Sequence, residues 1–164
     1  PGWVKGGARW GKSQAYRGGL GIIAAGMVST FFTGPSQVAL FYVPLVFLGI
    51  GFSSFQLFPF SMLPDTIEYD EMKSGLRREG IFSGAWASGQ KLAYSLGPAI
   101  VGFALSLSGF TAGGEQPASV SLGIRIVFCL FPAVMLLASY IPFSRYDLTA
   151  ERFEEIKKAI RGNG

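Results

Sequence analysis

The stretch GIFSGAWASGQKLAYSLGPAIVGFALSLSGFTAGG (80–114) contains a single charged residue, Lys91. A helix needs about 20 mostly apolar residues to cross a bilayer, and this stretch exceeds that length. A lysine at membrane depth costs roughly 2.5–3.5 kcal/mol on insertion scales, so it is kept where a partner or a water-filled path stabilises it. The stretch therefore predicts a membrane-spanning helix with a functional lysine. A lysine that snorkels to the membrane interface is the simpler alternative.

The composition is typical of a membrane protein. The chain is 49% hydrophobic and only 15% charged, whereas about one quarter of a soluble domain is charged. It contains no histidine and one cysteine, Cys129, so an intrachain disulfide and the usual zinc ligand sets are excluded. No nucleophile–base pair or metal-ligand cluster is visible in the sequence. We therefore expect neither an enzyme nor a metal site within this chain.

The uncharged segments predict an all-α integral membrane protein. No charged residue occurs between Gly18 and Pro64, a length that fits two helices separated by the turn residues 33–36. We predict four membrane helices, near 16–33, 37–63, 81–107 and 123–143. Together they make residues 1–143 part of a transporter-like bundle. Pro64 is expected to end the second helix and residues 65–79 to form a charged loop. The tail, residues 144–164, is expected to form a short amphipathic helix.

The basic residues are distributed asymmetrically. In this arrangement twelve of the 14 Lys and Arg residues lie on one side of the membrane, in the N-terminal segment, the 65–79 loop and the tail. Only Arg125 lies on the other side. The positive-inside rule makes the basic side cytoplasmic, so both ends of the chain are expected in the cytoplasm. The asymmetry also accounts for the net charge of +4 without a nucleic-acid partner.

Small and polar residues follow one side of the predicted helix 81–107. They recur at steps of three and four residues: Gly84, Ser88, Lys91, Ser95, Pro98 and Gly102. Close packing of a neighbouring helix would explain the small residues, but it does not explain the lysine. The adjoining strip carries Trp86, Gln90 and Tyr94, and an aromatic face beside hydrogen-bonding groups suits a sugar ring. Interfacial anchoring is the alternative for the tryptophan.

Two further sets of polar residues are candidates for function. Gln56 lies inside the second predicted helix and would line a pore or make a packing hydrogen bond. The loop 65–79 mixes acids and bases, so it is either a solvated loop or a cytoplasmic gate. Asp65, Arg77 and Arg78 are the best placed of its residues to form ion pairs that break and re-form between two conformations.

The charge of Lys91 indicates that this chain is completed by other polypeptide. The four predicted helices contain no Asp or Glu, so a counter-charge for this lysine has to come from outside them. A buried lysine without such a partner would tend to lose its proton. We therefore expect the chain to be about half of a transporter-like bundle or one subunit of an assembly.

The charged loop and the helix after it resemble a known family. MLPDTIEYDEMKSGLRREG (62–80) and GQKLAYSLGPAIVGFALSLSGF (89–110) resemble the glycoside–pentoside–hexuronide:cation symporters, a branch of the major facilitator superfamily that includes the melibiose permease. GKSQAYRGG (11–19) is similar to the loop before helix 9 of that family. The resemblance covers nearly the whole chain. It implies helices 9–12 of a twelve-helix bundle, with the N-terminal half missing here.

The resemblance also implies roles for residues. Lys91 matches the family lysine near the sugar and the coupling cation, Na⁺ or H⁺, whose carboxylate ligands lie mostly in the N-terminal half. Five residues match the loop that helps to close the cytoplasmic side, namely Asp65, Glu68, Tyr69, Arg77 and Glu79. Melibiose-type members carry a Gln-Thr pair where this chain has Trp86-Ala87, and a sugar-lining aromatic falls near Gln56. These departures argue against melibiose as the substrate.

We therefore expect part of a secondary transporter in the inner or plasma membrane. It would couple Na⁺ or H⁺ flow to the uptake of a sugar or glycoside by alternating access. The expected partners are the substrate, the lipid bilayer and the missing N-terminal half. Two alternatives stay open, a small four-helix membrane protein that acts as an assembly or regulatory subunit, and a lysolipid transporter of the same fold.

Overall fold

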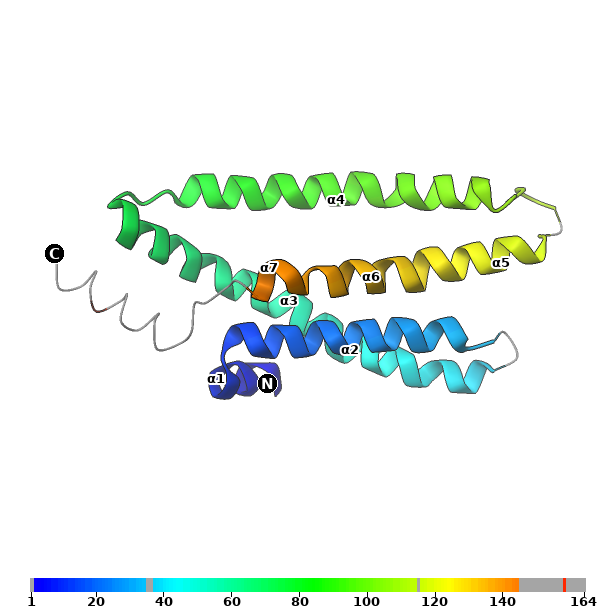
Figure 1. The fold of residues 1–164 in the computed structure, drawn as a ribbon, viewed down its shortest axis with the longest axis horizontal. Coiled ribbons are helices and arrows are strands. Elements are labelled where there is room, and N and C mark those ends of the chain that lie inside the picture. Colours follow the sequence, from blue (N-terminus) through cyan, green and yellow to red (C-terminus); the bar gives the residue numbers. More distant parts are fainter. Residues whose placement is uncertain (1, 35–36, 115, 145–157, 159–164) are drawn as a thin grey trace.

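The computed structural model describes residues 2–34, 37–114, 116–144 and 158. These residues form helices and connecting turns, with no strand among them. The elements in chain order are α1 Gly2–Trp10, α2 Lys12–Phe32, α3 Val38–Ser74, α4 Glu79–Leu107, α5 Ala118–Arg125, the π-helix η1 Ile126–Leu130, α6 Phe131–Ala138 and α7 Tyr140–Ser144. The last four elements follow one another closely and form one long helical rod (Figure 1). The fold is therefore all-α, as the sequence predicts.

Helix α3 continues past the point where we expected it to end. It includes Pro64 and most of the charged segment, and it ends at Ser74. Gly75 then adopts the left-handed conformation, with φ of 68°, which commonly terminates a helix. A proline removes one backbone hydrogen bond and bends a helix, but it does not stop a helix that neighbouring groups support. The prediction of a loop over residues 65–79 was therefore wrong, because only residues 75–78 link α3 to α4.

The N-terminal segment is also helical rather than a loop. Helix α1 lies against α3, where Nε1 of Trp3 donates hydrogen bonds to the carbonyl oxygen of Ile50 at 2.9 Å and to Oγ of Ser53 at 3.0 Å. The glycines and charges of α1 are typical of a loop when the sequence is considered alone. Docking onto α3 supplies stabilisation that local sequence does not reveal, because short helices gain most of their stability from packing.

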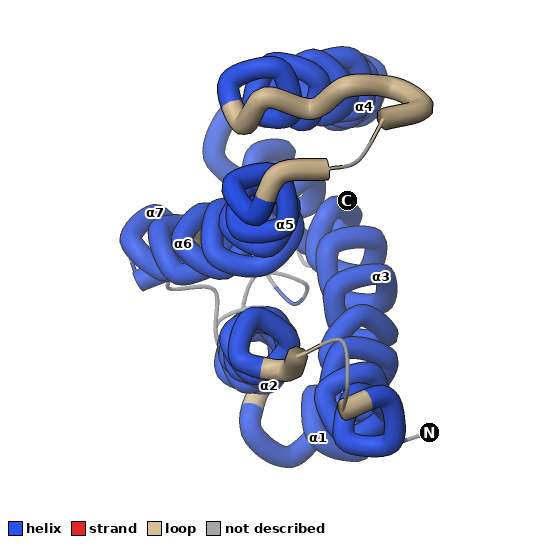
Figure 2. The backbone as a smooth tube through the Cα atoms, turned by 90° about the vertical axis from the view of Figure 1, so that its right-hand side faces the viewer, coloured by secondary structure: helices blue, strands red, loops and turns tan. Residues whose placement is uncertain are grey.

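The core lies where α2 crosses α3. A Cβ atom added to Gly51 would lie 2.8 Å from the backbone nitrogen of Ile23 and 2.9 Å from the carbonyl oxygen of Gly19. Small residues at a helix crossing allow the backbones to approach this closely. The buried side chains around the crossing include Leu20 and Phe58. The rod also packs against α2, which therefore has both α3 and the rod as helical neighbours (Figure 2).

Two helical segments are long and apolar enough to cross a membrane. They are Val38–Ser74 and Ala118–Phe143. In each of them, only 17% of the most apolar stretch of 18 residues is buried inside the structure. This exposure differs from that of a core helix in a soluble protein, which is mostly buried. Helices α2 and α4 do not meet the same measure of length and hydropathy. The arrangement with four spans therefore stays a prediction.

The remaining boundaries lie near the predicted ones, with two differences. Helix α2 begins at Lys12 rather than near residue 16. The rod begins at Ala118 rather than near Gly123, so the turn after α4 is shorter than the predicted loop. Within that turn, Gln116 donates to the carbonyl oxygens of Thr111 at 2.6 Å and Gly114 at 2.9 Å. Of the predicted tail, residues 144–164, the structure describes only Ser144, the last residue of α7, and Lys158, so the amphipathic helix lies outside the described residues.

Helix α4 has a distinct position in the molecule. It lies along one edge of the structure and contacts α3 through the connection at its start and α5 near its end (Figures 1 and 2). None of its residues is buried. The divergence of α4 from α3 leaves space between the two helices, and the candidate site lies there.

Candidate functional site

A cavity of about 440 Å³ lies between α3 and α4. Tyr16 of α2 and Phe143 of α7 complete its lining. Its volume falls in the range of about 300–1,000 Å³ that is typical of small-molecule sites. The lining is rich in aromatic rings, and three of its non-aromatic residues have polar side chains. The aromatic residues are Tyr16, Phe55, Phe60, Trp86, Tyr94 and Phe143, and the three polar residues are Gln56, Thr66 and Gln90.

The cavity brings together four of the five residues that the sequence indicated for substrate binding. Gln56 comes from α3, and Trp86, Gln90 and Tyr94 come from α4. The three α4 residues share one strip because they are four residues apart, slightly more than one helical turn. Lys91, the fifth candidate, is not among the residues that line the cavity. Sequence reasoning missed Thr66, which our prediction assigned to a loop.

The contact between Phe60 and Trp86 shows which residues of α3 and α4 lie opposite each other across the cavity. Their ring centroids are 5.8 Å apart in an edge-to-face arrangement. Helices α3 and α4 run in opposite directions from their connection (Figure 1). Gln56 lies one turn before Phe60, and Gln90 lies one turn after Trp86, so both steps lead away from the connection. The two carboxamides therefore lie at a similar level on opposite walls of the cavity.

Trp86 contributes an unsatisfied donor. Its Nε1 atom is buried and has no hydrogen-bond partner among the described residues. Indole nitrogen is a donor only, and buried tryptophan N–H groups usually have a partner. Leaving such a group without an acceptor costs about 1–3 kcal/mol. An acceptor atom on a molecule within the cavity would remove this cost.

A pair of hydrogen bonds holds the wall of the cavity formed by α2 and α7. The rings of Tyr16 and Phe143 lie with their centroids 4.9 Å apart. The Arg17 guanidinium donates a hydrogen bond to the carbonyl oxygen of Phe143, and the Tyr140 hydroxyl donates to the carbonyl oxygen of Arg17. These reciprocal contacts fix the end of the rod against the start of α2. The two aromatic rings are thereby held at the edge of the cavity.

Lys91 occupies an exposed part of α4. Its side chain has no ion-pair partner among the described residues. Its backbone carbonyl accepts a hydrogen bond from the hydroxyl of Ser95 at 3.0 Å. Because it directly follows Gln90, it lies about 100° around the helix from that cavity-lining residue. The other members of the predicted small and polar face are exposed as well, namely Gly84, Ser88, Ser95, Pro98 and Gly102.

The predicted gate residues divide into two separate sets. Asp65 is buried and forms an ion pair with Lys12, with Nζ and Oδ2 2.6 Å apart. The same ammonium group donates to the carbonyl oxygen of Ser61 at 3.1 Å. This ion pair links the start of α2 to α3, across 53 residues of sequence. Our prediction placed Asp65 with Arg77 and Arg78, and it did not identify Lys12 as a partner.

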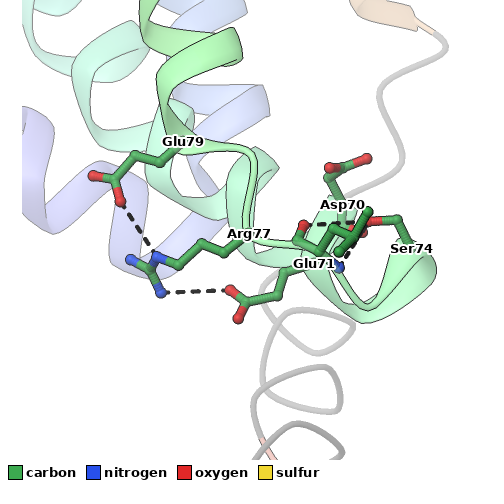
Figure 3. Close-up of polar contacts among 6 residues, drawn as sticks. Asp70, Glu71, Ser74, Arg77 and Glu79 are labelled. Carbon is green, nitrogen blue, oxygen red and sulfur yellow. Dashed lines mark hydrogen bonds and ion pairs between the residues drawn. The ribbon is translucent and has the colours of Figure 1, made fainter.

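The second set stabilises the connection between α3 and α4. Arg78 binds Asp70 through two nitrogens, at 2.9 and 2.7 Å. Arg77 lies 3.4 Å from Glu71 and 3.3 Å from Glu79, so it joins the two helices (Figure 3). All of these partners lie within a few residues of one another in sequence. These pairs therefore hold a local turn rather than two distant parts of the bundle.

The last two gate candidates lie between these sets. The Tyr69 ring contacts the Lys73 ammonium, which is 4.5 Å from the ring centroid. Oε2 of Glu68 is buried without a hydrogen-bond partner among the described residues. The sequence did not identify Asp70 and Glu71 as the partners of the arginines. We predicted a loop there, and a loop does not define which side chains face one another. Because α3 continues to Ser74, Asp70 and Glu71 lie near its end, within reach of the arginines of the connection.

A family model described as MFS/sugar transport protein matches residues 1–150. The chain belongs to this family. The resemblance that the sequence suggests is thus confirmed, and with it the assignment to the major facilitator superfamily of membrane transporters rather than to an enzyme class. The match includes α1 through the rod, so it covers both walls of the cavity.

The chain is similar to proteins that are named as symporters or carriers. An uncharacterized symporter of Synechocystis sp. is 38% identical over 133 residues, which cover 77% of this chain and 24% of the relative. A glucuronide carrier protein homolog of Escherichia coli is 30% identical, with 95% of this chain and 34% of the relative covered. A sodium-dependent lysophosphatidylcholine symporter of Xenopus tropicalis is 27% identical, with coverage of 93% and 30%. The chain thus spans about a quarter to a third of the length of these relatives.

Proposed function

We propose that the chain is part of a secondary transporter that couples the flow of Na⁺ or H⁺ to the movement of a sugar or glycoside. The observation that carries the proposal is the cavity, in which Gln56, Trp86, Gln90 and Tyr94 meet. Carboxamides bind hydroxyl groups as donors and as acceptors, and aromatic rings pack against the apolar face of a sugar. The family description and the glucuronide carrier homolog support a substrate of this chemistry.

The proposal places the chain within a longer bundle. Helices α2, α3, α4 and the rod would be helices 9–12 of a twelve-helix protein, and its N-terminal half would cover the exposed side of α4. Lys91 lies on that exposed side. In this arrangement its ammonium would face carboxylates of the other half, which bind the coupling cation. The lysine would therefore act on the cation site, next to but separate from the cavity.

We further propose that α2, α3, α4 and the rod each cross the membrane, with both ends of the chain in the cytoplasm. The excess of basic residues on that side supports this topology. The connection between α3 and α4 would then be cytoplasmic. The Lys12–Asp65 pair lies toward this side of the cavity, beside Thr66 in the lining. It is therefore the best candidate for an ionic contact of the cytoplasmic gate.

Uptake by the full-length protein tests the proposal. Cells or membrane vesicles that contain the protein would be given radiolabelled hexoses, methyl glycosides and hexuronates, with an imposed gradient of Na⁺ or of H⁺. We expect accumulation of at least one sugar that requires one of the two gradients. The Gln56→Ala and Gln90→Ala variants should lose this uptake while their level in the membrane is unchanged. Absence of gradient-dependent uptake for every sugar would contradict the proposal.

A lysolipid is the second candidate substrate. The support for it is the relative from Xenopus tropicalis, which is named as a sodium-dependent lysophosphatidylcholine symporter. The same vesicles, given labelled lysophosphatidylcholine, distinguish the two substrates. Na⁺-dependent uptake of the lipid without uptake of sugars would favour this second function. The third possibility that the sequence left open, an assembly subunit, has no support in the family match, which describes a transport protein.

A further inference from the structure

The rod packs against two different neighbours along its length. Its first segment, α5, contacts α4, whereas η1 and α6 contact α2. The π-helix η1, Ile126–Leu130, lies where the rod passes from one neighbour to the other. We propose that the rod bends at this π-helix, so that α5 moves with α4 while α6 and α7 stay with α2. The use of this motion in alternating access rests on the proposed function.

The start of the rod is fixed to the end of α4. Oγ of Ser119 donates a hydrogen bond to the carbonyl oxygen of Ser108, which directly follows α4, at 3.0 Å. A Cβ atom added to Gly123 would lie 2.8 Å from Cβ of Ser108, so the glycine allows the two segments to touch. Val120, between these two residues of α5, is only 1% exposed. Helix α5 therefore forms one packed unit with the end of α4.

The other end of the rod is fixed to α2. The Tyr140 hydroxyl donates a hydrogen bond to the carbonyl oxygen of Arg17, and the Arg17 guanidinium donates to the carbonyl oxygen of Phe143. Leu136, Tyr140 and Phe143 pack against the buried cluster of α2 and α3. Ala133, close after η1, is only 2% exposed. Moving this part of the rod away from α2 would break these buried contacts, so we expect it to stay in place.

The backbone hydrogen bonds of the rod are incomplete between these two fixed parts. The N–H group of Phe131 donates to the carbonyl oxygen of Ile126, five residues back, as in a π-helix. The next residue, Pro132, has no N–H group. The carbonyl oxygen of Val127 therefore has no donor in either register, because its α-helical partner would be Phe131 and its π-helical partner Pro132. Bending here breaks fewer hydrogen bonds than elsewhere in the rod, and sharp kinks in helices occur at prolines and π-helical turns.

The hinge would allow the end of α4 to move relative to α2 and α3. Helix α5 is fixed to that end of α4, so the two would move together while the contacts between the rod and α2 remain. Helix α4 also carries Trp86, Gln90 and Tyr94 on its cavity side. In the proposed topology the moving end is extracellular. The bend would therefore change access to the cavity from the side opposite the α3–α4 connection.

Distances between spin labels in the full-length protein test the hinge. Labels would be placed at exposed positions of α2, α4, α5 and α6, in a background without other cysteines, Cys129 included; the positions are Phe32, Leu96, Leu122 and Val134. Pulsed electron paramagnetic resonance would be recorded in NaCl and in choline chloride, each at acidic and at alkaline pH. We expect two distances for the α2–α5 pair, in proportions that change with these conditions, and one distance each for the α4–α5 and α2–α6 pairs. A single unchanged distance for the α2–α5 pair, or two distances for either other pair, would overturn the inference.

A variant with a regular α-helical rod assigns the motion to the π-helix. Deletion of Phe128, whose side chain is 55% exposed, makes the Phe131–Ile126 hydrogen bond span four residues, as in an α-helix, and keeps the orientation of α5 and α6. Combined with Pro132→Ala, it completes the backbone hydrogen bonds. This double variant should show a single α2–α5 distance and lose gradient-driven uptake, at an unchanged level in the membrane. Pro98→Ala, which removes the proline inside α4, is the control and should retain both distances.

The outcomes separate the hinge from the proposed function. Uptake of sugars by a protein whose α2–α5 pair has one distance would overturn the hinge and leave the function in place. Two distances that the double variant lacks, without uptake of any sugar, would support the hinge and contradict the function. If the double variant does not reach the membrane, Pro132→Ala alone provides the test, because it supplies an N–H donor for the carbonyl oxygen of Val127. Two distances in unchanged proportions in Pro132→Ala would then contradict a hinge at the π-helix.

Discussion

Helices α2 and α4 use similar residues in opposite surroundings. Both are rich in glycine, alanine and serine. Helix α2 has seven buried residues, and a Cβ atom added to its Gly26 would meet Leu48 at 3.1 Å. Helix α4 has no buried residue, and nothing lies within 4 Å of a Cβ atom added to its Gly84 or Gly102. Small residues allow close packing, but they do not by themselves show whether the packing partner belongs to the same chain.

The difference between α2 and α4 divides the molecule into a packed core and an exposed helix. The α2–α3 crossing and the rod form a core from residues of this chain alone. Helix α4 has no buried residue, and its contacts with the rest of the chain are the connection to α3, the strip that lines the cavity and the contact with α5 near its end. In the proposed transporter, helices outside this chain would cover that surface, including Lys91. Substitutions at the α2–α3 crossing and along α4 distinguish these two kinds of packing.

The largest effect on stability is expected for Gly51→Ala. The added methyl group would lie 2.8 and 2.9 Å from backbone atoms of Ile23 and Gly19, and backbone atoms cannot rotate away. We expect a loss of about 3 kcal/mol, at the upper end for overpacking, measured as thermal unfolding of the full-length protein in detergent. Gly49→Ala is the matched control on the same helix, since nothing lies within 4 Å of its added Cβ atom. Equal stability of the two variants would show that α2 and α3 do not cross as described.

An intermediate effect is expected for Asp65→Asn. The carboxylate is 8% exposed and pairs with Lys12, whose side chain is 42% exposed. The lysine can regain water when the pair is broken, so we expect a loss of about 1–2 kcal/mol rather than the larger value for a fully buried pair. If the pair also closes the cytoplasmic side, the variant should increase the labelling of a cysteine placed at Thr66. Glu79→Gln, at an exposed position of the α3–α4 connection, is the control, and a similar response of both variants would remove Asp65 from the gate.

The elements that the sequence predicts best are those with long uncharged segments. The end of α2 and both ends of α4 follow from turn residues and charges close in sequence, whereas α2 begins at Lys12, before the predicted start near residue 16. The path of α3 past Pro64 does not follow from the sequence, because it depends on support from neighbouring helices. The strip Trp86, Gln90 and Tyr94 is predictable from helical spacing, whereas its placement opposite Gln56 requires the angle between α3 and α4.

The ion pairs show the same contrast between local and distant information. The Arg78–Asp70 pair becomes evident once the helix is extended to residue 74, since the two residues then lie on either side of one turn. The Lys12–Asp65 pair joins residues that are 53 positions apart, and no pattern in a single sequence indicates such a pairing. The aromatic lining of the cavity is also not predictable from the sequence, because Tyr16 and Phe143 come from α2 and α7, which are far apart in the chain. Both the ion pair and the aromatic contacts depend on tertiary packing.

The smallest effect is expected for Arg78→Ala. The arginine and its partner Asp70 lie at the connection between α3 and α4, with exposed side-chain fractions of 42% and 21%. Ion pairs that are accessible to water contribute about 0.2–1 kcal/mol, so the unfolding midpoint should fall by only a few degrees. High salt should reduce the difference further. A loss as large as that of Gly51→Ala would mean that this connection, rather than the α2–α3 crossing, determines the stability of the fold.

We propose that the exposed face of α4 acts in cation coupling through Lys91. The most direct measurement compares gradient-driven sugar accumulation by the full-length Lys91→Ala and Leu92→Ala variants at equal levels in the membrane. Leu92 is the matched control, because it is the next residue on α4 and is 63% exposed. We predict that Lys91→Ala abolishes accumulation driven by the Na⁺ or H⁺ gradient and that Leu92→Ala retains it. Accumulation by Lys91→Ala at the wild-type level would contradict the account.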